Sequence, residues 1–182
     1  MNIAVFASGR GTNFSAIIGA VKAGRLKANI ALLVCDNHKA EVLSRARKAG
    51  VKIALIKKEE QILGHLRENK IELIALAGFM RILSPAFVSR YQNHILNIHP
   101  SLLPAFKGAH AIKDAFAYGA KVTGVTVHFV DEKIDHGPII LQQAVTIGQE
   151  DTLESLEEKI HKVEHNLYPK AIQLVISGRF KI

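Results

Sequence analysis

The sequence predicts an α/β protein, with an open, mostly parallel twisted sheet and helices on both faces. Short apolar runs rich in β-branched residues alternate with stretches of helical periodicity. This alternation is typical of parallel strands joined by helices. The length of 182 residues suits one domain with a sizeable core, and neither an internal repeat nor a linker interrupts it. We therefore expect a single domain over residues 1–182.

Each expected element follows from a local pattern. Five apolar runs have the length and composition of buried strands: Ile3–Ala7, Ile30–Cys35, Ile53–Ile56, Leu73–Ala77 and Ile95–Ile98. Helical periodicity separates the first four of them, near Thr12–Ala23, Lys39–Ala49 and Glu59–Asn69. Two later runs are expected to be extended, with a loop between them: Val122–Val130, Ile139–Val145 and the loop Asp135–Pro138.

A long terminal helix is expected to begin at Asp151. Apolar residues recur there at helical spacing: Leu153, Leu156, Ile160, Val163 and Leu167. Glu154 stands three residues after Asp151, which is the spacing of a capping box. Pro169 predicts a kink or the end of the first helical segment, because proline lacks the N–H that a helix interior needs.

Composition and charge favour a soluble protein that acts on an anion. The formal net charge is +8, and a positive field attracts phosphates, polycarboxylates or nucleic acid. The basic residues are dispersed without an aromatic-rich basic motif, so an anionic small substrate is favoured over nucleic acid.

The opening MNIAVFA is too short for a signal peptide or a membrane span. The single cysteine, Cys35, excludes an intrachain disulfide and fits a core residue of a cytoplasmic protein.

The stretch LNIHPSLLPAF (Leu96–Phe106) places two polar residues at the end of an apolar strand. Asn97 and His99 are two residues apart, so they project from the same face. Pro100 cannot donate to a sheet ladder and marks the end of the strand. Open α/β sheets bind ligands at the carboxyl ends of their strands. Asn97 and His99 are therefore candidate site residues.

The stretch ASGRGTN (Ala7–Asn13) follows the first strand and opens a helix. Small residues allow backbone N–H groups to approach a ligand, and a helix N-terminus favours an anion. The stretch is neither a P-loop nor a full dinucleotide fingerprint, because no Lys-Ser/Thr pair follows and Phe14 replaces the third glycine. It is compatible both with a phosphate site and with a simple tight turn capped by Thr12.

Two further stretches carry groups that can do chemistry. HKVEH (His161–His165) has the form of a zinc motif, but no acidic residue follows that could be the third ligand, so we expect no metal. In HFVDEKIDHGPI (His128–Ile139), Asp135 becomes important if the fold brings it to His99. An Asp–His–Asn cluster can transfer protons beside a developing negative charge. A Ser–His–Asp hydrolase is a weaker alternative, since no G-x-S-x-G elbow is present.

Taken together, these stretches resemble the phosphoribosylglycinamide formyltransferase family. The resemblance extends over essentially the whole chain and rests on VFASGRGTN, LAGFMRILSP (Leu76–Pro85), NIHPSLLP (Asn97–Pro104), VHFVDEKIDHGPII (Val127–Ile140) and EHNLYP (Glu164–Pro169). It implies a Rossmann-like formyltransferase fold and a cytoplasmic enzyme of de novo purine biosynthesis. The implied reaction moves the formyl group of 10-formyltetrahydrofolate to the amine of glycinamide ribonucleotide, without a metal. The expected partners are these two small molecules, with no nucleic acid or membrane, and the chain is expected to be a monomer or a homodimer.

The resemblance also implies roles for individual residues. Asn97 and His99 would hydrogen-bond the oxygen of a tetrahedral intermediate, and Asp135 would orient His99 and assist proton transfer. The substrate phosphate would lie against Gly11, Thr12 and Asn13, and the ribose or glycinamide against His161 and Glu164. The folate would contact Met80, Arg81, Ile82, Leu83, Asn97, Asp131, Glu132, Lys133, Ile134 and Asp135. His128 would contact the site residues without contacting the substrates. Lys57 or Lys58 stands where the family often has an arginine that contacts folate.

The same resemblance leaves alternatives open. Formyltetrahydrofolate hydrolase should carry an extra N-terminal domain and methionyl-tRNA formyltransferase a C-terminal RNA-binding domain, so neither is the expected activity. A non-catalytic nucleotide-binding module would bind without formyl turnover.

The stretch SLLP lies beside the expected site, where a sharp backbone reversal would help to hold the loop. We therefore expect a cis peptide bond between Leu103 and Pro104, against the low frequency of cis X–Pro bonds.

Overall fold

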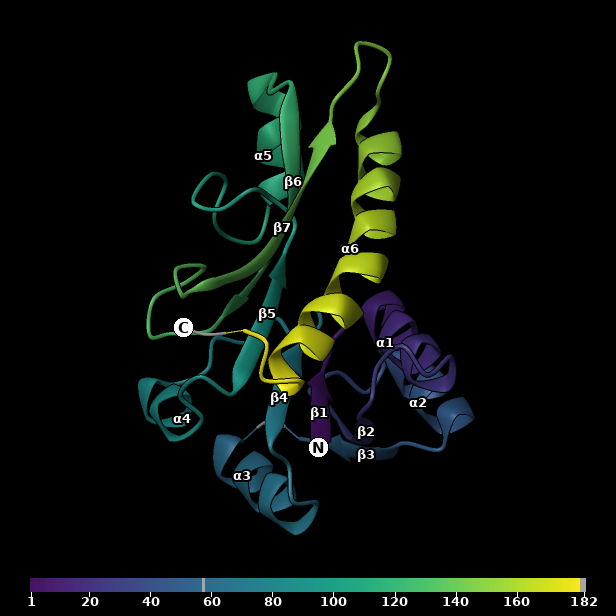
Figure 1. Ribbon diagram of the computed structural model, residues 1–182, viewed down its shortest axis with the longest axis vertical. Coiled ribbons are helices and arrows are strands. Elements are labelled where there is room, and N and C mark those ends of the chain that lie inside the picture. Colours follow the sequence, from purple (N-terminus) through teal and green to yellow (C-terminus); the bar gives the residue numbers. More distant parts are fainter. Residues whose placement is uncertain (57, 181–182) are drawn as a thin grey trace.

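The computed structural model describes residues 1–56 and 58–180 and has the predicted fold class (Figure 1). Its elements in chain order are β1 (Asn2–Phe6), α1 (Thr12–Lys22), β2 (Asn29–Cys35), α2 (Val42–Ala49), β3 (Lys52–Leu55), α3 (Glu59–Glu68), β4 (Leu73–Leu76), α4 (Pro85–Arg90), β5 (Ile95–His99), α5 (Ala111–Tyr118), β6 (Val122–Phe129), β7 (Ile139–Thr146) and α6 (Leu153–Ile176).

One sheet of seven strands organises the molecule, in the order β3-β2-β1-β4-β5-β6-β7. The first five strands of this order pair in parallel, while β6 and β7 are antiparallel to their neighbours. The strand order reverses at β1, which lies between β2 and β4. In doubly wound sheets the crevice at such a reversal is where ligands bind. The carboxyl ends of β1, β4 and β5 are therefore the expected place for a site.

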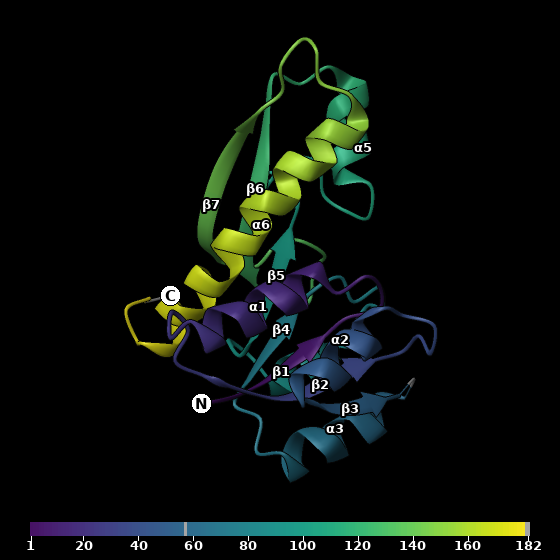
Figure 2. The same ribbon diagram turned by 90° about the vertical axis from the view of Figure 1, so that its right-hand side faces the viewer.

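The sheet has a core on each face, because successive strand residues point to opposite sides. In β1, Ile3 and Val5 pack with buried residues of α1, α2 and α6, while Ala4 and Phe6 pack with those of α3 and α4. Figure 1 shows α1, α2 and α6 on one side of the sheet and α4 on the other, and Figure 2 shows the β6–β7 hairpin and α5 extending beyond the parallel strands. Cys35 is fully buried in the first core, as predicted.

The terminal helix differs from its prediction at its N-terminus. The N-cap is Thr152, which forms a capping box with Ser155, so the predicted pair Asp151 and Glu154 is wrong. Asp151 instead accepts hydrogen bonds from Lys159, Ser155 and the Gly148 amide, and these hold its pKa at about 2. Because the Asp151 carboxylate makes these hydrogen bonds, it does not cap the helix, and Thr152 is the N-cap instead.

Pro169 does not end α6, which continues to Ile176. Pro169 is buried, and the fully buried Tyr168 places its hydroxyl 2.8 Å from the Leu76 carbonyl and 3.1 Å from the Leu96 carbonyl. Tertiary packing of this segment on β4 and β5 therefore outweighs the local cost of the proline.

Two short helices, α4 and α5, were not predicted. α4 has only six residues, with Ser84 as N-cap and a proline in its first turn, and a helix of this length is too short to show a periodic pattern.

The Leu103–Pro104 bond is cis, as predicted. Among residues 1–56 and 58–180, no helix combines the length and the apolarity needed to cross a membrane.

Candidate active site

Two cavities open at the carboxyl ends of β1, β4 and β5. The first, of about 230 Å³, we call the α1 cavity; it is lined by Gly9, Arg10, Gly11, Thr12, Asn13, Ala77, Gly78, Ile98, Pro100, His161 and Glu164. The second, of about 160 Å³, we call the hairpin cavity; it is lined by Leu76, Phe79, Arg81, Ile82, Leu83, Val88, Asn97, His128, Val130 and residues 131–135. Each cavity is lined by one residue of β5: Ile98 lines the α1 cavity, and the adjacent Asn97 lines the hairpin cavity.

The α1 cavity contains every residue predicted to hold the substrate phosphate, ribose or glycinamide. Gly11 is the N-cap of α1 and has a left-handed φ of 73°. A Cβ atom at Gly11 would lie 2.5 Å from Cγ2 and 2.6 Å from Cβ of Val42 in α2. Glycine is thus required both by the backbone conformation and by the close approach of α2. The N-terminus of α1 faces this cavity with no acidic residue in its first turn, which suits an anion.

A chain of polar side chains lines the opposite wall of the α1 cavity. The buried Glu164 accepts hydrogen bonds from Asn13 Nδ2 at 3.1 Å and from His161 Nδ1 at 3.0 Å. His161 Nε2 lies 3.0 Å from Arg10 Nη2, which can only donate. His161 therefore carries its proton on Nδ1. The buried Oδ1 of Asn13 has no hydrogen-bond partner within the described structure.

The three residues predicted to be catalytic lie together at the end of β5, and two of them, Asn97 and Asp135, line the hairpin cavity. His99 Nδ1 is 3.3 Å from Asp135 Oδ2, and Asn97 Nδ2 is 3.4 Å from Asp135 Oδ1. His99 Nε2 lies 2.8 Å from the Phe106 carbonyl, on the β5–α5 loop. Both nitrogens of His99 thus face oxygen acceptors, and only a doubly protonated ring can donate to both. The fold brings Asn97, His99 and Asp135 together as predicted.

His128 lies behind this group on β6, opposite Asn97 in the β5–β6 ladder. Its Nδ1 is 2.7 Å from the Phe129 carbonyl and therefore donates, which leaves Nε2 as an acceptor in the neutral ring. Asn97 Nδ2 donates to this Nε2 at 3.2 Å. His128 is 2 % exposed, so it fixes the Asn97 amide from a buried position.

Asp135 is held in place by backbone as well as side-chain contacts. Its φ of 47° is left-handed, which aspartate tolerates better than most residues, and its Oδ2 accepts the Gly108 amide at 2.8 Å. Burial by itself raises the pKa of Asp135, but the hydrogen bond from the Gly108 amide and the neighbouring His99 outweigh burial and lower the pKa below its usual value. Asp135 is thus ionised over the ordinary working range of an enzyme.

The hairpin cavity contains most of the residues predicted to bind folate. Its outer wall is the β6–β7 loop, in which Asp131 accepts hydrogen bonds from His136 Nδ1 at 2.6 Å and from the Lys133 amide at 2.9 Å. Ile82 and Ile134 are largely exposed and offer apolar surface at the mouth. Met80 and Lys58 are not among the lining residues, and Lys58 is the N-cap of α3. Lys57 lies outside the described residues.

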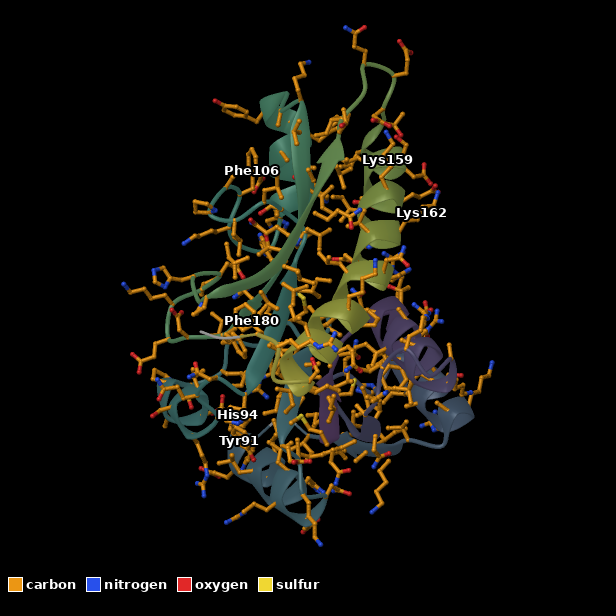
Figure 3. The ribbon with its side chains drawn as sticks, in the orientation of Figure 1. Tyr91, His94, Phe106, Lys159, Lys162 and Phe180 are labelled. Atoms are coloured by element: carbon orange, nitrogen blue, oxygen red, sulfur yellow. The ribbon has the colours of Figure 1, made fainter. Side chains whose placement is uncertain are left out.

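Some groups at the site were not predicted from the sequence. Arg10 lines the α1 cavity, and a basic residue inside a glycine-rich turn is a signal that could have identified it. The Phe106 carbonyl and the Gly108 amide act through the backbone, which no residue type reveals. Figure 3 shows Phe106 on the loop beside β6, away from Lys159 and Lys162 on α6.

The HKVEH stretch is organised differently from a zinc site. Both ring nitrogens of His161 contact protein groups, and the rings of His161 and His165 are stacked with centroids 6.4 Å apart. In the described part of the chain, no group of three or more His, Cys, Asp or Glu residues is placed to hold a metal ion.

Comparison with known proteins decides the family. A model of the formyl transferase family matches residues 1–172. The chain belongs to this formyl transferase family. It is 47% identical over 182 residues to phosphoribosylglycinamide formyltransferase of Bacillus subtilis (strain 168), covering 95% of this chain and 93% of the relative.

Solved structures of the family have the same fold. Glycinamide ribonucleotide transformylase 1 from Geobacillus kaustophilus is 48% identical with a TM-score of 0.93, covering 96% of this chain and 97% of that one. Phosphoribosylglycinamide formyltransferase from Anaplasma phagocytophilum is 39% identical with a TM-score of 0.96, covering 100% of this chain and 90% of that one. The predicted family and the Rossmann-like formyltransferase fold are thus confirmed.

Proposed function

We propose that this formyltransferase moves the formyl group of 10-formyltetrahydrofolate to the amine of glycinamide ribonucleotide. The observation that carries the proposal is the cluster of Asn97, His99 and Asp135 at the end of β5. Its residues Asn97 and Asp135 line the hairpin cavity, and the neighbouring Ile98 lines the α1 cavity. A group-transfer enzyme with two substrates needs a pocket for each and reacting groups at their junction. In the hydrolysis alternative, the α1 cavity would have no substrate to hold.

The phosphate of the acceptor is best placed at the N-terminus of α1. Gly11, Thr12 and Asn13 line the cavity there, and backbone N–H groups at a helix start favour an anion. The Asn13 side chain has a different role, because its Nδ2 donates to Glu164 and its free Oδ1 is an acceptor. A phosphate needs donors, whereas a ribose hydroxyl or the glycinamide portion can donate to Asn13 Oδ1 and to Glu164.

The folate is best placed in the hairpin cavity, with its formyl group directed toward Asn97. Attack of the amine on the formyl carbon gives a tetrahedral intermediate with an oxyanion. The contact from Asn97 Nδ2 to Asp135 is long at 3.4 Å, so this N–H is the one available to the oxyanion, while the bond to His128 keeps the amide oriented. A protonated His99 next to it places a positive charge beside the oxyanion, while its two N–H groups face Asp135 and the Phe106 carbonyl.

Asp135 serves the proton transfers of the same reaction. Its carboxylate supports the protonated His99 at 3.3 Å and is an acceptor for the proton that the attacking amine must lose. That proton finally reaches the folate nitrogen as the carbon–nitrogen bond to the formyl carbon breaks. Because the Gly108 amide fixes Asp135, the carboxylate can act without reorganising.

The proposal predicts that 10-formyltetrahydrofolate is consumed only when glycinamide ribonucleotide is present. Formylated product and tetrahydrofolate should appear in equal amounts, because the acceptor amine takes the place that water has in a hydrolase. Absorbance of the released tetrahydrofolate and mass spectrometry of the nucleotide measure both. Equal consumption of the donor without acceptor would assign the chain as a hydrolase instead.

Substitution of Gly11 by alanine should weaken acceptor binding by at least about tenfold and leave folate binding nearly unchanged. The new Cβ atom would overlap Val42, so the turn that holds the phosphate must shift. Calorimetric titration with each substrate measures the two affinities.

The matched control is Gly24→Ala, since Gly24 also has a left-handed φ, of 69°, but has no atom within 4 Å of an added Cβ. It should bind the acceptor normally. If Gly11→Ala loses affinity for both substrates together, the turn is structural and the assignment of the phosphate to it is wrong.

A further inference from the structure

Ser8 is a buried residue after β1 and before α1, and all its polar groups are engaged. Its hydroxyl donates to Asp36 Oδ1 at 2.6 Å and accepts the Met80 amide at 3.1 Å. Its own amide donates to the Gly78 carbonyl at 3.0 Å, and its carbonyl accepts Asn37 Nδ2 at 3.2 Å. Ser8 is 8 % exposed. One residue thus joins the ends of β1, β2 and β4.

The segment that Ser8 holds, Ala77–Leu83, passes from one cavity to the other. Ala77 and Gly78 line the α1 cavity, whereas Phe79 and the residues after Met80 line the hairpin cavity. On the other side, Ser8 directly precedes the turn that leads into α1. The two hydrogen bonds to Gly78 and Met80 therefore fix the wall of one cavity relative to the floor of the other.

We propose that Ser8 is a positioning residue that couples the acceptor site to the folate site. This inference rests on the proposed function, because it concerns how the two substrates are aligned. Only a hydroxyl can donate to Asp36 and accept from Met80 at the same time. In a Ser8→Ala variant the Met80 amide loses its acceptor. The backbone hydrogen bond to the Gly78 carbonyl remains and Met80 is 69 % exposed, so folding is preserved, but the segment is no longer held at Met80.

The test is to titrate Ser8→Ala separately with glycinamide ribonucleotide and with tetrahydrofolate. Loss of one hydrogen bond corresponds to about a 2- to 10-fold change in an equilibrium constant. We expect both dissociation constants to rise by such a factor, with the shape of the pH–rate profile unchanged because Asn97, His99 and Asp135 are intact. Ser44→Ala, which removes an exposed hydroxyl on α2, is the matched control and should change neither constant.

Hydrogen exchange gives a direct structural readout of the same contact. The Met80 amide should exchange faster in Ser8→Ala than in the wild type, while the amides of β4 keep their protection. If Ser8→Ala does not fold, Asp36→Ala removes the other end of the hydroxyl's hydrogen bond and should raise both dissociation constants.

Two results separate the coupling from the proposed function. A wild-type protein without formyl transfer would overturn the function. A wild-type protein with formyl transfer, whose Ser8→Ala variant keeps both affinities or loses only one of them, would overturn the coupling alone.

Discussion

The substitution Asp135→Asn should lower turnover by about 10²–10⁴ while changing the affinity for either substrate little. The introduced amide keeps the shape, and an oxygen in the place of Oδ2 can still accept from the Gly108 N–H and from His99, but it carries no charge. Without that negative charge, a protonated His99 loses the electrostatic support that it has in the wild type. The carboxylate that accepts the amine proton is lost as well.

Steady-state kinetics and substrate titrations of the two proteins measure this effect, and proton NMR can follow the imidazole N–H that faces Asp135. Asp114→Asn, an exposed carboxylate on α5, is the control and should be fully active. Nearly unchanged turnover in Asp135→Asn would reduce Asp135 to a loop residue.

The low pKa of Asp135 also fixes the sign of its pH dependence. Because the pKa is lowered in the folded protein, Asp135 stabilises the fold above its unfolded value, and this contribution is lost as pH falls through the folded value. Turnover should therefore not be limited by protonation of Asp135 at any pH above about 4. An acid limb of the pH–rate profile above that pH must belong to another group.

The sequence was informative wherever a residue type carried the signal. The alternation of strands and helices predicted the parallel part of the sheet, and the spacing of Asn97 and His99 predicted that they share a face. Asp135 could be assigned to them only through the family resemblance, since 36 positions of chain separate it from His99 and the antiparallel return of β6 brings it back.

What could not be predicted depends on backbone groups and on packing. The Phe106 carbonyl and the Gly108 amide complete the site, yet any residue can supply a carbonyl or an amide. Similarly, Pro169 predicted a kink or an end in the terminal helix, and the end does not occur because Tyr168 is buried against β4 and β5. Local propensity is a weak guide where tertiary contacts are this extensive.

Asn97→Ala and His99→Ala should each lower turnover by at least about 10²–10³, because the first removes a donor and the second a positive charge from the place where the oxyanion forms. Either variant combined with Asp135→Asn should lose much less than the product of the single losses, since the three side chains contact one another and act as one unit. Rapid-quench measurement of a single turnover isolates the chemical step from product release. His94→Ala, an exposed histidine before β5 that Figure 3 labels, is the control and should retain full turnover. If the losses multiply instead, Asn97, His99 and Asp135 act independently, and the shared site at the end of β5 is not the unit of catalysis.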